Sequence, residues 1–96
     1  MIKSFACDKT RQLFETGKAT HFLRAIEQPA KRKLTMLHLA KLLDDLRVPP
    51  GNRLEALSGN RVGQYSIRIN QQYRLCFRFI EGHAEDAEIV DYSEYV

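Results

Sequence analysis

The strongest pattern in the chain is a stripe of apolar residues spaced three or four positions apart over residues 30–47. The stripe consists of Ala30, Leu34, Leu37, Ala40, Leu43 and Leu46, with Leu39 and Leu42 at its margin. Residues three and four apart share one side of a helix, so this spacing predicts one long helix with a buried face. The run 48–52 ends that helix, because its two prolines cannot continue the hydrogen-bond ladder.

Shorter elements are predicted before this helix. Residues 2–5 alternate loosely and favour a short strand. A short helix is expected to follow and to end at Gly17, with the side chain of Asp8 or Thr10 capping its first turn. The next stretch is less regular, and Pro29 fits the first turn of the long helix.

After residue 52 the apolar period changes to two. This alternation predicts strands over 53–57, 64–70, 73–80 and 87–92. The order of a short strand, two or three helices and a mainly antiparallel set of strands predicts an α+β fold, with the helices packed on one face of the sheet. A second core does not fit in 96 residues, so residues 1–96 are expected to form a single domain.

Composition narrows the class of protein. With 44% hydrophobic and 28% charged residues, the chain is typical of a folded domain rather than a disordered one. It has neither a run of about 18 apolar residues nor an apolar leader, so no membrane association and a cytoplasmic location are expected. Cys7 and Cys76 lie far apart without a CxxC motif, which argues against a zinc cluster or a disulfide framework.

The net charge of +3 is distributed unevenly. Residues 1–48 carry a net +5, and residues 49–80 carry a net +4 from five arginines and a single acid, Glu55. Residues 81–96 carry six acids and no Lys or Arg. A basic body indicates a polyanionic partner, with nucleic acid the leading candidate. The acidic end either shields the basic surface or aids solubility.

The arginines follow the predicted strands. If 71–72 forms a hairpin, Arg68 and Arg74 point to the same side of neighbouring strands, and Arg78 lies further along that side. The apolar residues of these strands must meet the helices, so the arginines are expected to form an open cationic floor with hardly any acid to pair with. A guanidinium can hold a phosphate through two parallel N–H bonds. The alternative is an ordinary solvated sheet face.

Other candidate chemistry is sparse. His21, His38 and His83 lack metal-ligand spacing, and no glycine-rich phosphate loop or nucleophile motif is present, so neither a metal nor a cofactor is predicted. Cys76 alternates onto the arginine side of its strand and is expected to be structural. Tyr92 ends the last predicted strand, where it is structural, stacks on a base or donates a proton.

Several segments occur in the order seen in one toxin family. The chain begins MIKSF, carries RKLTML within the long helix, and continues with LRVPPGNRLEALSGNR at 46–61, GQYSIRIN at 63–70, YRLCF at 73–77 and EIVDY at 88–92. Together these segments resemble the HigB-type toxins, in the branch that includes GraT, of the RelE/ParE toxin–antitoxin superfamily.

The resemblance implies a compact RelE-like fold and a toxin of a type II toxin–antitoxin pair. It implies a ribosome-dependent, metal-independent mRNA endoribonuclease that inhibits translation, in which a 2′-hydroxyl attacks the neighbouring phosphate. The family's catalytic positions carry over to Arg68, Arg74 and Tyr92. RNA contacts are expected from Arg53, Asn60, Arg61 and Arg78. The implied partners are a HigA-like helix-turn-helix antitoxin, the ribosome and mRNA, and operator DNA through the antitoxin.

The proton-transfer group departs from the family pattern. The family often ends in Asp-Tyr-His, whereas residues 91–93 read Asp-Tyr-Ser, and an alignment shifted onto 94–96 does not restore the histidine. Glu55 or Tyr92 is then expected to be the general base, with Asp91 a weaker choice. Because proton transfer typically supplies about 10²–10⁴-fold in rate, a slow and mild enzyme is expected.

Two further function classes remain open at this stage. ParE-like members of the superfamily resemble non-enzymatic inhibitors of DNA gyrase, which the missing histidine would favour. A third possibility is a binding module that acts with its antitoxin in repression. RNA cleavage on ribosomes and inhibition of supercoiling separate the first two classes.

Overall fold

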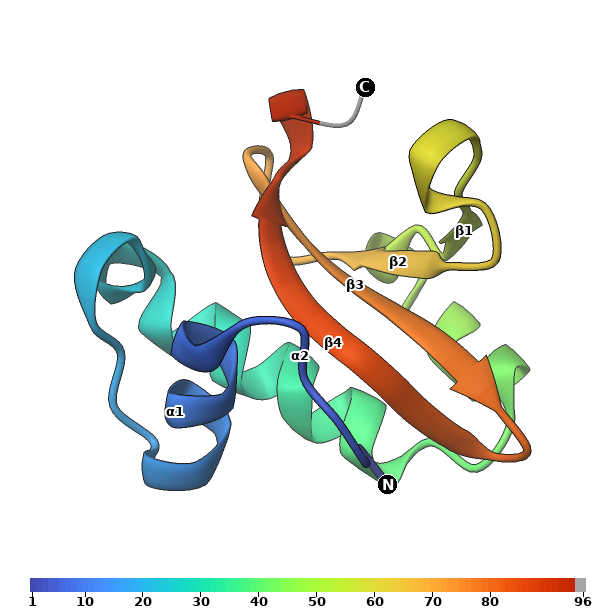
Figure 1. The fold of residues 1–96 in the computed structure, drawn as a ribbon, viewed down its shortest axis with the longest axis horizontal. Coiled ribbons are helices and arrows are strands. Elements are labelled where there is room, and N and C mark those ends of the chain that lie inside the picture. The colour runs from blue at the N-terminus through green and yellow to red at the C-terminus, as the bar shows by residue number, and fades with distance from the viewer. Residues whose placement is uncertain (95–96) are drawn as a thin grey trace.

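Two α-helices pack against a four-stranded antiparallel sheet in the computed structural model, which describes residues 1–94 (Figure 1). The helices are α1 (Asp8–Thr16) and α2 (Glu27–Leu39), and the strands are β1 (Glu55–Ala56), β2 (Tyr65–Arg68), β3 (Tyr73–Ile80) and β4 (His83–Asp91). Short 3₁₀ turns connect them: η1 (His21–Ile26), η2 (Leu43–Arg47), η3 (Pro50–Asn52), η4 (Gly59–Arg61) and η5 (Tyr92–Glu94). The predicted α+β architecture is confirmed.

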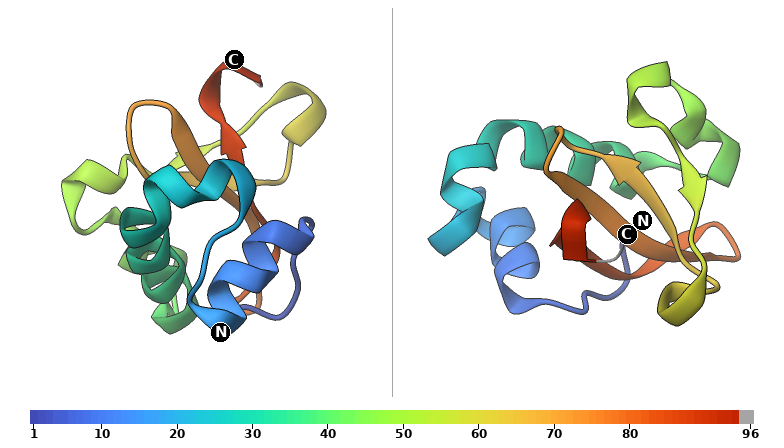
Figure 2. Two further views of the ribbon diagram at one scale, coloured as in Figure 1. Left: turned by 90° about the vertical axis from the view of Figure 1, so that its left-hand side faces the viewer. Right: turned by 90° about the horizontal axis from the view of Figure 1, so that it is seen from above.

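The strands lie in the order β1-β2-β3-β4, with the two helices on one side of the sheet (Figure 2). Their register aligns one row of apolar residues. Ile67 of β2 pairs with Leu75 of β3, and Leu75 pairs with Ile89 of β4. Leu34 and Leu37 of α2 are buried in the same core. Burying a large aliphatic side chain contributes roughly 1.5–3 kcal/mol, so this row fixes which face of the sheet is covered. The arginines consequently occupy the other face.

The long predicted helix is shorter than the apolar stripe suggests. Helix α2 ends at Leu39, where the backbone of Ala40 becomes extended, and the later apolar positions of the stripe fall in η2. The break is stabilised by the Asp45 carboxylate, which accepts hydrogen bonds of 3.0 Å from the backbone N–H groups of Lys41 and Leu42. These two bonds lower the pKa of Asp45 below its ordinary value. Ala40 still reaches the core, which is why periodicity alone extends the helix too far.

Four of the predicted strands also differ from the observed ones, and the strand predicted over 64–70 is shortened to β2, Tyr65–Arg68. Residues 2–5 pair with β4 at two isolated parallel bridges, Ile2 with Ala84 and Phe5 with Ala87, instead of forming a strand. The strand predicted over 53–57 is reduced to the two residues of β1, because Arg53 adopts a left-handed φ of 46°. Strand β4 begins at His83 rather than 87, since a register shift opposite Cys76–Arg78 and a positive φ at Asp86 interrupt its alternation.

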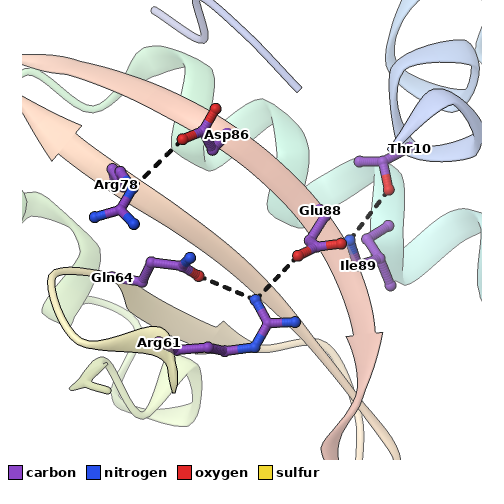
Figure 3. A network of polar contacts seen from close by, with 7 residues as sticks. All are labelled: Thr10, Arg61, Gln64, Arg78, Asp86, Glu88 and Ile89. Atoms are coloured by element: carbon purple, nitrogen blue, oxygen red, sulfur yellow. Dashed lines mark hydrogen bonds and ion pairs between the residues drawn. The ribbon is translucent and has the colours of Figure 1, made fainter. Parts of the chain in front are cut away.

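Neither predicted cap serves α1, which begins after Cys7 without a side-chain cap. Asp8 is already helical and pairs with Arg11. Thr10 is fully buried, and its hydroxyl oxygen accepts a hydrogen bond of 3.1 Å from the backbone N–H of Ile89 (Figure 3). Thr10 thereby ties α1 to the edge of β4. Within residues 1–94 no helix combines the length and the apolar character needed to cross a membrane.

Replacing Thr10 by valine is expected to lower the free energy of unfolding by about 1–3 kcal/mol, because valine keeps the shape but leaves the buried N–H of Ile89 without an acceptor. Urea denaturation measures this change. Thr35→Val is the matched control, since the exposed Thr35 hydroxyl bonds only to the Lys31 carbonyl of its own helix. Equal losses in the two variants would contradict the role assigned to Thr10.

Candidate functional site

A pocket of about 190 Å³ lies where the end of β2 and the start of β3 meet the turn after β4. Its lining consists of Arg53, Arg68, Asn70, Gln71, Arg74 and Tyr92. Arg68 and Arg74 are direct cross-strand partners, which confirms their predicted placement on one side of adjacent strands. The pocket brings together four of the eight side chains predicted to act in catalysis or RNA binding: Arg53, Arg68, Arg74 and Tyr92.

Arg74 is held in one orientation instead of lying on an open floor. It is only 6% exposed. Its Nε donates to the Ser66 hydroxyl at 2.7 Å, and its Nη2 donates to the carbonyls of Arg53 at 2.6 Å and Ser66 at 3.3 Å. Among residues 1–94, its Nη1 donates no hydrogen bond. The result is a buried, preorganised guanidinium that still has donors to offer an anion.

Glu55 lies at the edge of the site, next to Arg74. It lies on β1 opposite Ser66, and its Oε1 is 3.6 Å from Arg74 Nε. The Glu55 side chain is 43% exposed, so it is open to solvent and to a ligand. Its role as general base stays a prediction.

Tyr92 stands in η5, directly after β4, and its ring centre is 5.7 Å from the guanidinium carbon of Arg74. Its backbone N–H donates to the Gln72 carbonyl at 2.6 Å, which fastens the turn to the β2–β3 hairpin. A second, wider hollow of about 620 Å³ adjoins the first, and the two share Gln71 and Tyr92. Tyr92 therefore separates the arginine pocket from a more open surface.

Ser93, which the resemblance aligns with the family histidine, binds Asp91. The Asp91 Oδ1 accepts hydrogen bonds from the N–H of Ser93 at 3.0 Å and its hydroxyl at 2.8 Å, while Oδ2 accepts one from the Gln72 amide at 3.0 Å. The Gln72 and Ser93 bonds lower the pKa of Asp91. These contacts hold η5 in place and make Asp91 a weak proton acceptor. The alternative alignment onto 94–96 extends beyond the described residues.

Asn52 is a residue that sequence reasoning missed. It is fully buried, its Nδ2 donates to the Leu46 carbonyl at 3.1 Å, and its Oδ1 accepts from Lys33 Nζ at 2.6 Å. Burial, and secondarily the charge of Arg32, lowers the pKa of Lys33. Asn52 thus fixes the turn that places the Arg53 carbonyl on Arg74. The only available signal was an amide directly after Pro-Pro-Gly, a position that is usually exposed.

The other three predicted RNA contacts lie outside the pocket. Asn60 is exposed on η4. Arg61 Nη1 donates to Glu88 Oε1 and to Gln64 Oε1, each at 3.0 Å, and Arg78 Nε lies 3.4 Å from Asp86 Oδ2 (Figure 3). The expectation of a sheet face with hardly any acid is wrong, because the acidic end of the chain forms β4 and brings these carboxylates onto that face.

Cys76 lies buried on this same face, between Ser66 of β2 and Glu88 of β4. Burial raises the pKa of its thiol to about 11, which outweighs the opposing effect of Arg61. The thiol therefore stays protonated at neutral pH and is a poor nucleophile. Within residues 1–94, no three His, Cys, Asp or Glu side chains are grouped so that they could hold a metal ion.

Comparisons with known proteins identify the family of the chain and agree with its fold. Residues 3–95 match the family model described as RelE-like toxin of type II toxin–antitoxin system HigB. Toxin HigB-1 of Vibrio cholerae serotype O1 is 46% identical over 74 residues, which cover 76% of this chain and 78% of that protein. Endoribonuclease HigB of Proteus vulgaris is 30% identical over 95 residues, 99% of each chain.

In three dimensions the chain is similar to the YoeB-YefM complex from Staphylococcus aureus, with a TM-score of 0.55 and 15% identity over 92% of this chain and 95% of that chain. At that identity the similarity supports the fold alone. The family model spans nearly the whole sequence, and the relative from Proteus vulgaris aligns over its full length. The chain therefore belongs to the HigB-like family of RelE-like toxins of type II toxin–antitoxin systems.

Proposed function

We propose that this toxin is an endoribonuclease that cuts mRNA on the ribosome and binds the scissile phosphate in the pocket of Arg53, Arg68 and Arg74. The observation that carries the proposal is the fixed, buried guanidinium of Arg74 next to the partly exposed Arg68. Donors held in place in this way stabilise charge that develops on a phosphate without reorganising during the reaction. A relative named as an endoribonuclease supports the same activity.

The reaction assigned to the pocket is an internal transfer. The 2′-oxygen of the RNA bonds to phosphorus, the bond from phosphorus to the 5′-oxygen breaks, and a cyclic phosphate and a 5′-hydroxyl result. Glu55 takes the proton from the 2′-hydroxyl, because its carboxylate oxygens accept hydrogen bonds beside Arg74. Tyr92 gives a proton to the leaving 5′-oxygen, because its phenolic O–H is a hydrogen-bond donor. Arg68 and Arg74 neutralise the charge gained by the phosphate.

The partner assignments follow from the toxin class. Type II toxins act in pairs with an antitoxin, and we assign a HigA-like helix-turn-helix protein to this role, which would bring operator DNA into the complex. The substrates proposed here, mRNA and ribosomes, place the activity in the cytoplasm. The antitoxin would have to cover the arginine pocket or prevent entry to the ribosome.

The purified protein is expected to cut a defined mRNA within codons on translating ribosomes, as mapped by primer extension. Arg68→Ala is expected to lower the cleavage rate about 10²–10³-fold, the usual loss when a charge-stabilising donor is removed. Its thermal midpoint should change little, since Arg68 is partly exposed and makes one hydrogen bond, from Nε to the Asn70 carbonyl at 3.2 Å. Arg24→Ala, at an exposed residue of η1, is the control and should cut at the native rate.

If Arg68→Ala cleaves RNA at the native rate, the pocket does not take part in the reaction. If the native chain does not cleave RNA at any concentration, the nuclease proposal itself is contradicted. A supercoiling assay with DNA gyrase on the same preparation would then decide for or against the gyrase inhibitor.

A further inference from the structure

The open face of the sheet carries two sets of arginines with different surroundings. The pocket set is Arg53, Arg68 and Arg74. Among residues 1–94, only Arg74 of this set lies within ion-pair distance of a carboxylate, that of Glu55 at 3.6 Å. The pocket end of the face is therefore cationic and open to an anion.

The far set, Arg61 and Arg78, is matched one to one by carboxylates of β4 (Figure 3). The Arg61–Glu88 pair is close, at 3.0 Å, and both side chains are only about a quarter exposed, at 22% and 25%. The Arg78–Asp86 pair is looser, at 3.4 Å, with side chains 39% and 50% exposed. The formal charges of these two ion pairs cancel.

Both far arginines are also engaged by the loop between β1 and β2. Arg61 belongs to that loop and donates to its Gln64 as well as to Glu88. The Arg78 guanidinium lies against the backbone of Gly63, where an added Cβ would come within 2.7 Å of Nη1. Each guanidinium is thus held by its surroundings in the orientation that meets its carboxylate.

We propose that Glu88 and Asp86 are specificity-determining residues, which confine the RNA backbone to the pocket end of the sheet by neutralising Arg61 and Arg78. The inference rests on the proposed function, because it takes RNA as the ligand. A phosphate that approached Arg61 would have to displace a hydrogen-bonded, partly buried carboxylate and then lie beside that uncompensated negative charge. The same carboxylates repel the backbone along the far end of β4.

Salt dependence measures how many phosphates the protein neutralises. Each phosphate contact on a single strand contributes about −0.7 to the slope of log K against log salt concentration. The native chain should show a shallow slope that reflects the pocket set alone. Neutralising Asp86 and Glu88 removes the carboxylates that pair with Arg78 and Arg61, so the slope should steepen by about 1.4.

The test is fluorescence anisotropy with a short, labelled single-stranded 2′-O-methyl RNA over a salt series. This probe cannot be cleaved, because its 2′-oxygen carries no proton. The double variant Asp86→Asn/Glu88→Gln should bind about tenfold more tightly than the native chain at low salt, with the steeper slope. The control Glu15→Gln/Glu81→Gln has the same net charge but changes exposed residues on α1 and at the hairpin turn, and should keep the native slope.

The inference is overturned if the double variant keeps the native slope or does not bind RNA. It is also overturned if the control variant gains as much RNA affinity as the double variant. If the double variant unfolds, the single variant Asp86→Asn is the test, because the half-exposed ion pair of Asp86 with Arg78 contributes little to stability. The slope of this variant should steepen by about 0.7. Native cleavage on ribosomes is measured separately. If the native chain does not cleave RNA on ribosomes but the slope of the double variant is steeper, only the proposed function is contradicted. If the native chain cleaves RNA but the slope of the double variant is unchanged, only this inference is contradicted.

Discussion

Arg74→Ala is expected to reduce RNA cleavage about 10²–10³-fold and to lower the free energy of unfolding by about 2–3 kcal/mol. The loss of activity follows from removing the one guanidinium of the pocket that is buried and fully oriented. The loss of stability follows because the carbonyl of Arg53, and the hydroxyl and carbonyl of Ser66, lose their shared donor. Primer extension and urea denaturation measure the two effects on the same preparation.

Arg74→Lys separates charge from geometry. An ammonium keeps the charge, but as a single donor centre it cannot serve Ser66 and the Arg53 carbonyl and also present a flat edge to a phosphate. Its cleavage rate is expected to stay at least about tenfold below that of the native chain. Arg78→Ala is the matched control, since Arg78 lies on the same strand in a half-exposed ion pair whose loss costs about 0–1 kcal/mol. A fully active Arg74→Lys would show that charge alone is needed.

The pairing of Arg68 with Arg74 was predictable because it follows from local rules. A strict period of two on both strands and a short connection leave one register, and that register places both side chains on the face opposite the core. The identity of the core-facing side was equally predictable, because the row that includes Ile67 and Leu75 has to be buried.

The neutralised end of the sheet was not predictable in the same way. Glu88 and Asp86 follow Arg61 by more than twenty residues, and the pairing of β2 with β3 and of β3 with β4 brings these side chains to one face. A register shift and the left-handed backbone of Asp86 hide that strand's alternation from the sequence. The sequence therefore left open whether the acidic end shields the basic surface or aids solubility, and in the structure its strand β4 supplies the carboxylates that shield part of the cationic face.

The helix end and the turn after it were hidden for a related reason. The apolar stripe runs on past Leu39 because Ala40 and Leu46 are still buried, although the backbone has left the helix. Side-chain periodicity reports burial and does not by itself report hydrogen bonding. The same limit applies to Asn52, whose burial depends on partners that lie six and nineteen residues away.

Asn52→Ala is expected to lower the free energy of unfolding by about 2–4 kcal/mol, although it removes no apolar contact of the core. The variant leaves the Leu46 carbonyl without its buried donor and leaves the Lys33 ammonium, which is partly desolvated, without the amide oxygen at 2.6 Å. Cleavage on ribosomes is expected to fall about 10–100-fold even where the variant is folded, because the Arg53 carbonyl that orients Arg74 is displaced. Urea denaturation and primer extension measure the two effects.

Asn52→Asp distinguishes a hydrogen-bonding role from simple filling of space. Aspartate has the same shape and keeps an acceptor for Lys33, but it cannot donate to the Leu46 carbonyl and instead places a second oxygen 3.1 Å from it. The aspartate variant should therefore be destabilised at least as much as the alanine variant. Asn60→Ala, at an exposed asparagine, is the control and should change stability by less than about 0.5 kcal/mol. A stable and active aspartate variant would show that volume, and not the amide donor, holds the turn beneath the arginine pocket.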